Sequence, residues 1–169
     1  IYLSRPELGS SLWETILGAG RSENVRPGSP NIIDRVEAGL LSFGNEMTVE
    51  NTPLECNMDK FLDINKEANY IGKKVLQRQI RYGIKRRIRG VIYNGPKLPT
   101  ISRPLQVFDI DKRTIVGSLT SGAFSPHFKR NIGVGMIKYG YWDNNKKILV
   151  NIADQEFREG LIKDLPLIQ

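Results

Sequence analysis

The sequence has few of the residues that build metal centres, disulfide frameworks or membrane spans. Its 169 residues include one cysteine, Cys56, and one histidine, His127. One cysteine excludes an internal disulfide, and so few thiol and imidazole ligands exclude a zinc site of the Cys/His type. No apolar run approaches the ~20 residues that cross a bilayer. We therefore expect neither a metal nor a membrane partner.

The first residues, Ile1 to Arg5, lack the basic and apolar regions of a secretory signal. A single cysteine also fits a reducing compartment, so we expect a cytoplasmic protein. The sequence does not start with methionine, and Ile1 to Leu3 are typical of a strand already under way. We therefore expect that a first part of the protein precedes this chain.

What the sequence does contain is enough apolar material for a packed core and an excess of positive charge. Hydrophobic residues make up 40% and charged residues 25% of the chain, which excludes wholesale disorder. The net charge of +7 suits anionic partners. These could be nucleic acid, phosphorylated metabolites or polycarboxylates.

Helical patterns occupy the first half. The spacing of apolar residues predicts a helix that opens at Ser4 to Glu7 and ends at Gly18 to Gly20. A second helix is predicted to begin at Ser29-Pro30, a cap followed by proline in the first turn. A third is predicted over about 69–82, with an inward face of Ile71, Val75, Leu76 and Ile80.

After Gly83 the pattern changes to short β-rich runs between turn residues. The predicted strands are 88–93, 105–110, 114–120, 133–138, 147–152 and 157–163. Such spacing is typical of a small antiparallel barrel or sandwich. We place a domain boundary near residue 84.

Basic residues crowd the third predicted helix and the strand after it. No acidic residue occurs between Glu67 and Asp109, whereas eight lysines and arginines lie between Lys73 and Arg89. Clustered cations can bind nucleic-acid phosphates. No nucleic-acid-binding motif accompanies them, so we favour a solvated face, with one arginine serving a carboxylate ligand.

Two reactive side chains have a structural and a catalytic interpretation. Ser125 and His127 flank Pro126, which makes a serine–imidazole contact awkward. We therefore favour a loop histidine that bonds to the backbone. Cys56 has no catalytic histidine near it in sequence, and we favour a buried thiol that packs as a small hydrophobe. Asn31, at the start of the second helix, is a natural place for an anionic ligand.

The second helix and the loop after it resemble a motif of one enzyme family. Residues 35–46 read RVEAGLLSFGNE, similar to the R-x-E-A-G-L-x-x-Y-G-N-D of the aminomethyltransferases, the T-proteins of the glycine cleavage system. Residues 52–55 (TPLE) follow at that family's spacing. Residues 70–76 (YIGKKVL) resemble its F-I-G-R-E-A-L, and residues 120–126 (TSGAFSP) resemble its T-S-G-x-x-S-P. The likeness runs in order through nearly the whole chain.

Within this family the closest likeness is to the dimethylsulfoniopropionate demethylases. Residues 25–31 (VRPGSPN) resemble their V-K-P-G-C-P-N, and residues 125–129 (SPHFK) match theirs. Residue 31 is asparagine, as in the demethylases, where T-proteins hold the folate tail with an arginine; this change removes a charged donor pair. Residues 51–55 and 120–122, by contrast, resemble an ordinary T-protein.

The resemblance implies an α+β fold in which three domains surround a folate. Residues 1–83 would be the end of the folate-binding, ferredoxin-like α/β domain, and residues 84–169 a C-terminal antiparallel β-barrel domain. It implies tetrahydrofolate as cofactor. The residues carried over as cofactor-binding are Asn31, Arg35, Glu55 and Tyr2. The catalytic residues are expected in the preceding part, so we expect this chain alone to be inactive.

The resemblance implies demethylation of dimethylsulfoniopropionate, giving 5-methyltetrahydrofolate. The partners would be a small-molecule one-carbon donor and the preceding part of the same protein. The alternative is the aminomethyltransferase reaction, which forms a methylene bridge and releases ammonia. A basic nucleic-acid-binding module rests on charge alone. A folate-binding member without catalysis is disfavoured, because residues 70–74 lack the K-G-C type motif of such members.

Overall fold

The computed structural model describes residues 2–28 and 31–168. It divides into two compact units, residues 1–30 and residues 31–169. The two units are described separately below. Within the described residues, no helix is long and apolar enough to span a membrane.

The first unit contains a short 3-10 helix, Pro6–Leu8, followed by α1, Gly9–Ala19. The predicted first helix is thus confirmed, and it ends as expected at Gly20, whose N–H donates to the carbonyl of Ile16 at 3.0 Å. The predicted strand at residues 1–3 is wrong for Tyr2 and Leu3, which have no strand structure, and Ile1 lies outside the described residues. No residue of α1 is buried.

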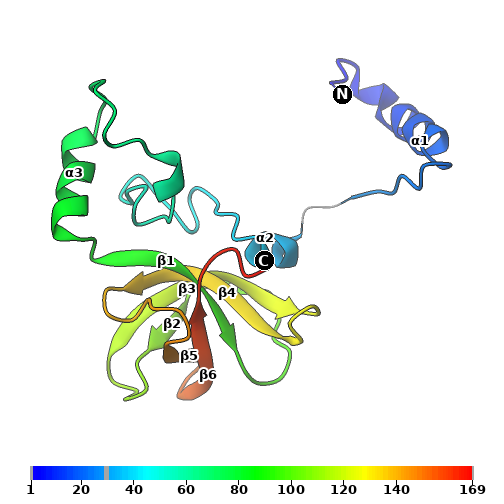
Figure 1. The fold of residues 1–169 in the computed structure, drawn as a ribbon. Coiled ribbons are helices and arrows are strands. Elements are labelled where there is room, and N and C mark those ends of the chain that lie inside the picture. Colours follow the sequence, from blue (N-terminus) through cyan, green and yellow to red (C-terminus); the bar gives the residue numbers. More distant parts are fainter. Residues whose placement is uncertain (1, 29–30, 169) are drawn as a thin grey trace. The chain divides into compact units, whose positions relative to one another are not determined.

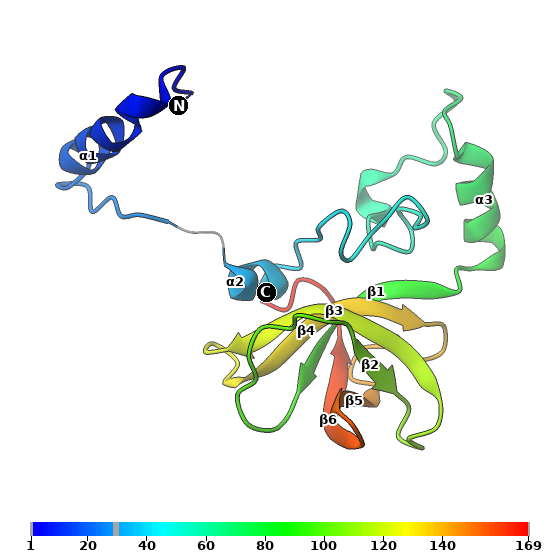
Figure 2. The same cartoon turned by 180° about the vertical axis from the view of Figure 1, so that it is seen from behind.

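The second unit is built on a closed antiparallel barrel, shown from two sides in Figures 1 and 2. Residues 86–163 are all described, and their strands are β1 Arg86–Tyr93, β2 Leu105–Phe108, β3 Ile115–Ser125, β4 Arg130–Lys138, β5 Lys147–Ala153 and β6 Glu156–Lys163. The order around the barrel is β1-β4-β3-β2-β5-β6. All the predicted strands are confirmed, and of the two predicted architectures the barrel is the correct one.

Residues 31–83, described without a gap, form α2 (Ile32–Glu37), a 3-10 turn (Asp59–Phe61) and α3 (Lys73–Tyr82) joined by loops. The predicted start of the second helix at Ser29-Pro30 is wrong. The backbone of Asn31 is extended, so the helix begins at Ile32, and Ser29 and Pro30 lie outside the described residues. The predicted ferredoxin-like α/β domain and the boundary at residue 84 stay predictions.

The third helix begins at Lys73 rather than near residue 69. Gly72 precedes it with a φ of 88°, a left-handed conformation that glycine tolerates and that cannot continue a right-handed helix. Its predicted inward face is also wrong in part. Leu76 is 6% exposed, but Ile71, Val75 and Ile80 are exposed at 104%, 55% and 58%.

The hydrophobic core has two parts. One fills the barrel and includes Val91, Leu119, Val150 and Ile162. The other lies outside the barrel wall, where Val36 of α2 packs with Ile88, Ile132 and Val134. Figures 1 and 2 both show α2 and the C-terminal segment together at this face of the barrel.

Polar bonds fix α2 at this place. The buried carboxylate of Glu37 accepts a hydrogen bond from the hydroxyl of Ser125 on β3. The carbonyl of Glu37 accepts from the N–H groups of Leu167 and Ile168 at 2.8 and 3.2 Å. One residue of α2 therefore holds both a barrel strand and the C-terminal segment.

Gly135 should be indispensable to the barrel. It pairs with Leu119 across β3 and β4. An added Cβ would overlap the backbone carbonyl of Ser118, which could move aside only if the pairing between β3 and β4 were broken. We expect Gly135→Ala to destabilise the barrel by roughly 1–3 kcal/mol, measured by thermal unfolding. Gly18→Ala, in open space on α1, should leave the barrel transition unchanged. Equal melting of Gly135→Ala and the parent protein would contradict this packing.

Candidate functional site

Asn31 acts in this structure as the N-cap of α2. Its Oδ1 accepts from the N–H of Asp34 at 2.9 Å, and its Nδ2 donates to the Asp34 carboxylate at 2.6 Å. Asparagine is among the residues that favour this position, because the side-chain oxygen satisfies a free helical N–H. Both polar ends of the Asn31 amide therefore have partners within its own turn.

Arg35 lies one turn further along α2 and pairs with Glu46. The Glu46 carboxylate is fully buried. Besides Arg35, it accepts from the N–H of Ser42 at 2.7 Å, from Nδ2 of Asn45 at 2.8 Å and from the hydroxyl of Ser121. The network joins α2, the loop after it and β3. The Arg35 side chain as a whole stays 25% exposed.

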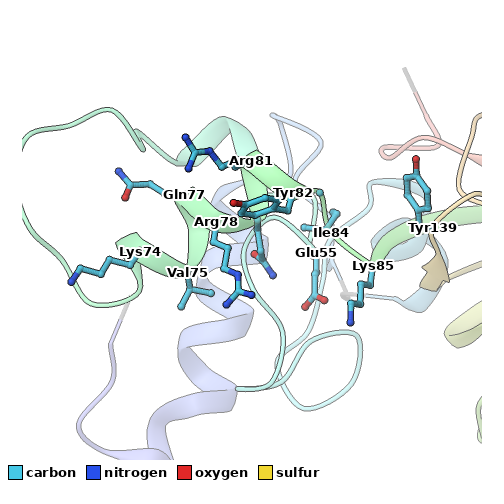
Figure 3. Close-up of a pocket in the computed structure, with 12 residues that line it drawn as sticks. Glu55, Lys74, Val75, Gln77, Arg78, Arg81, Tyr82, Ile84, Lys85 and Tyr139 are labelled. Atoms are coloured by element: carbon cyan, nitrogen blue, oxygen red, sulfur yellow. The ribbon is translucent and has the colours of Figure 1, made fainter.

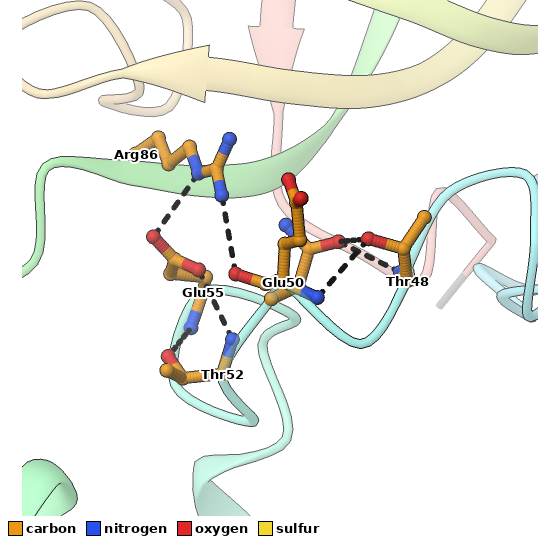
Figure 4. A network of polar contacts seen from close by, with 6 residues as sticks. Thr48, Glu50, Thr52, Glu55 and Arg86 are labelled. Carbon is orange, nitrogen blue, oxygen red and sulfur yellow. Dashed lines mark hydrogen bonds and ion pairs between the residues drawn. The ribbon is translucent and has the colours of Figure 1, made fainter.

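Glu55 lies on a different loop, which is held against β1 (Figure 4). Its Oε1 accepts from Nε of Arg86 at 3.1 Å, and its Oε2 accepts from the N–H of Thr52 at 3.0 Å. The carbonyl of Glu55 also accepts from the N–H of Ile88 at 2.7 Å. No hydrogen bond among the described residues joins Glu55 to Asn31 or Arg35.

Of the predicted cofactor-binding residues, the structure thus brings Asn31 and Arg35 together on one helix and places Glu55 on a separate loop. Tyr2 lies in the first unit, where its side chain is exposed. The binding role of all these residues stays a prediction.

Ser125 has a structural function. Its hydroxyl is buried, donates to Glu37 and accepts from the N–H of Phe128 at 3.0 Å. His127 is exposed in the turn between β3 and β4, and its ring packs edge-on against Phe128 at a centroid distance of 4.9 Å. The predicted turn position of His127 is confirmed, but among the described residues its ring has no hydrogen bond to the backbone, so that part of the prediction is not borne out. The serine has neither the exposure nor the partner of a hydrolase nucleophile.

Cys56 is buried, as predicted. Burial raises the pKa of its thiol, and the carboxylate of Glu55 raises this pKa further. Both effects keep the thiol protonated at neutral pH and therefore unreactive. The cysteine borders a partly open cavity of about 460 Å³, lined by apolar residues such as Leu41, Met58 and Ile88 and also by the charged residues Asp59 and Lys60. This cavity, which sequence reasoning did not find, has the size and lining to admit an aromatic ring.

The basic stretch consists of two groups with different surroundings. On β1, Arg86, Arg87 and Arg89 pair with Glu55, Asp59 and Asp164. Burial lowers the pKa of Arg87, and the neighbouring charge of Arg89 lowers it further. Lys74, Arg78 and Arg81 of α3 instead line a cavity of about 1510 Å³ beside Tyr82 and Tyr139 (Figure 3), whereas Lys73 donates to backbone carbonyls of residues 66–68. Their helical spacing was visible in the sequence, but which arginines have partners was not.

Residues 86–165 match the family of the glycine cleavage T-protein C-terminal barrel domain. The chain is 41% identical to the dimethylsulfoniopropionate demethylase of Ruegeria pomeroyi over 142 residues, which cover 84% of this chain and 38% of that protein. It is 36% identical to an aminomethyltransferase of Caldanaerobacter subterraneus over 164 residues, which cover 96% of this chain and 42% of that protein. The chain therefore spans less than half the length of these relatives.

The fold is also similar to a solved structure. The glycine cleavage system aminomethyltransferase T from Bartonella henselae matches with a TM-score of 0.69 and 22% identity, over 79% of this chain and 37% of that one. At this identity the likeness concerns the fold, and it includes the barrel that the sequence predicted.

The Glu46 network should contribute strongly to stability. Glu46→Gln would replace one carboxylate oxygen with an N–H₂ group, a donor that faces Arg35, Asn45 and Ser121, which are themselves donors. It would also leave Arg35 without a negative partner. We expect a loss of about 3–5 kcal/mol in urea unfolding, as for other broken buried pairs. Glu7→Gln, which breaks the exposed pair with Arg5, should cost below about 1 kcal/mol. Similar losses in the two variants would show that the network does not hold α2.

Proposed function

We propose that this chain, which belongs to the aminomethyltransferase family, is the C-terminal portion of a tetrahydrofolate-dependent one-carbon transferase. The proposed reaction is demethylation of dimethylsulfoniopropionate, with 5-methyltetrahydrofolate as product. The observation that carries it is Asn31, which occupies the helix start where T-proteins have an arginine and which caps α2 with its own side chain. The identity to the Ruegeria demethylase supports it.

The donor set of this chain fits a folate. Arg35 has a partly exposed side chain whose guanidinium is held by Glu46, and guanidinium groups are good donors to carboxylates. Glu55, with its carboxylate held by Arg86, is a fixed acceptor for N–H groups. The apolar side of the cavity beside Cys56 would suit an aromatic ring.

Tetrahydrofolate, when bound, would supply the N5 nitrogen that accepts the one-carbon unit. The residues of this chain would bind and orient it, since alignment in a dry pocket is the main contribution a protein makes to an in-line methyl transfer. We propose that the catalytic residues lie in the preceding part of the whole protein. That part would also complete the folate-binding domain, of which residues 1–83 are the end and Tyr2 a binding residue.

The alternative is the aminomethyltransferase reaction. The match to the Caldanaerobacter aminomethyltransferase covers more of this chain than the match to the demethylase. The loop with Thr52 and Glu55, whose hydrogen bonds are described above, also resembles that of a T-protein.

The two reactions differ in product, and we expect the whole protein to follow the first. With dimethylsulfoniopropionate and tetrahydrofolate it should form 5-methyltetrahydrofolate, measured by mass spectrometry. It should release little ammonia from the aminomethyl-lipoyl carrier protein. Ammonia release without methyl transfer from the sulfonium would decide for the aminomethyltransferase.

Asn31→Arg tests whether the start of α2 meets the folate tail. If a tail carboxylate is close, a charge-assisted bond should tighten folate binding by roughly 1–3 kcal/mol. The same change removes the cap and should cost about 1 kcal/mol of stability, so unfolding is measured alongside. Asn31→Ser keeps a capping oxygen without adding charge and should therefore not reproduce the tighter binding of Asn31→Arg. No change in affinity for Asn31→Arg would place the folate elsewhere.

A further inference from the structure

The cavity beside α3 has an unusual charge balance. Its cationic lining residues are Lys74, Arg78, Arg81 and Lys85. None of these side chains has a hydrogen bond or ion pair with another described residue, whereas the arginines of β1 are paired. The carboxylate of the lining residue Glu55 is already bonded to Arg86. The cavity therefore presents uncompensated positive charge.

The cations form a row rather than a cluster. Lys74, Arg78 and Arg81 are four and three residues apart, so they share one side of α3 over about 10 Å of helix axis. In Figure 3, Lys85 and Glu55 lie beyond Tyr82 from Lys74 and Arg78, and the flexible side chain of Arg81 points to the other side in this view. A single anion could meet one or two of these side chains, whereas an extended chain with repeated negative groups could meet all of them.

Glu55 connects this row with the proposed folate site, because it lines the cavity and is also one of the residues expected to bind the cofactor. A folate whose glutamate is lengthened by further γ-linked glutamates carries one free carboxylate per added residue. Such a tail is flexible, repeated and anionic, and guanidinium and ammonium groups are its natural donors. The aliphatic stems of the cations, with Val75 and Tyr82, can cover its methylene groups.

We propose that the cavity beside α3 binds the oligo-γ-glutamate tail of a folate, with Arg78 and Arg81 as its central donors. This rests on the proposed function for the identity of the ligand. The recognition itself depends only on the row of unpaired cations.

The test compares two double variants of equal charge. Arg78→Gln with Arg81→Gln removes the central donors and keeps helix propensity, because arginine and glutamine are similar helix formers. Arg103→Gln with Arg113→Gln removes two exposed arginines from barrel loops outside the cavity. The whole protein is titrated calorimetrically with tetra-γ-glutamate peptide and with 5-methyltetrahydrofolate carrying one or five glutamates, and circular dichroism checks α3.

We expect the pentaglutamate to bind more tightly than the monoglutamate. The α3 double variant should weaken pentaglutamate and peptide binding about tenfold, and the barrel-loop variant should not. Raising the salt concentration should weaken the same two interactions. If the glutamate peptide binds to the parent protein and binding is lost in the α3 variant, the binding role of the cavity is supported even when no methyl transfer is found. The proposed cavity and the proposed function can therefore fail independently.

Equal affinities for the one- and five-glutamate ligands would overturn the proposal. So would equal losses in the two double variants. Tighter binding of a ten-residue oligouridylate than of the glutamate peptide, lost in the α3 variant, would assign the row to nucleic acid instead.

Discussion

The buried face of α2 is the constraint on which the arrangement of the second unit depends. Val36 enters the apolar cluster outside the barrel, and the neighbouring Glu37 is held by Ser125 and by the C-terminal backbone. A carboxylate taken out of water is costly unless its oxygens have donors. Because its carboxylate accepts from Ser125 of β3 and its backbone carbonyl accepts from N–H groups of the C-terminal segment, α2 can satisfy Glu37 in one place only. Arg35, on the same helix, is placed with it.

The barrel could be predicted from the sequence because local patterns determine it. Short apolar runs between turn residues indicate antiparallel strands, and the fixed period of a strand makes such runs readable without a partner. The helix ends were harder. Gly72 prevents α3 from starting earlier, where apolar periodicity alone would begin it. Asn31 caps α2, so this helix begins after the proline that was expected to open it. In both cases one backbone conformation overrides the pattern.

The site was less predictable, since its contacts join residues far apart in the chain. Glu46 reaches Ser121 and Glu55 reaches Arg86 across loops whose course depends on the whole fold. A run of lysines and arginines looks uniform in a sequence. It divides into the arginines of β1, which pair with carboxylates of other segments, and Lys74, Arg78 and Arg81 of α3, which have no such partner among the described residues.

This division has a consequence for binding. The arginines of β1 already hold carboxylates, so an incoming anion would have to displace Glu55, Asp59 or Asp164 before it could bind there. Lys74, Arg78 and Arg81 of α3 need only lose water, and their Coulomb attraction for an anion is screened over a Debye length of about 8–10 Å at ordinary salt. The strongest anion attraction of this surface therefore lies on α3, even though β1 carries three arginines and α3 only two. Glu55 contacts both groups: its carboxylate pairs with Arg86 of β1, and it also lines the cavity of the α3 cations.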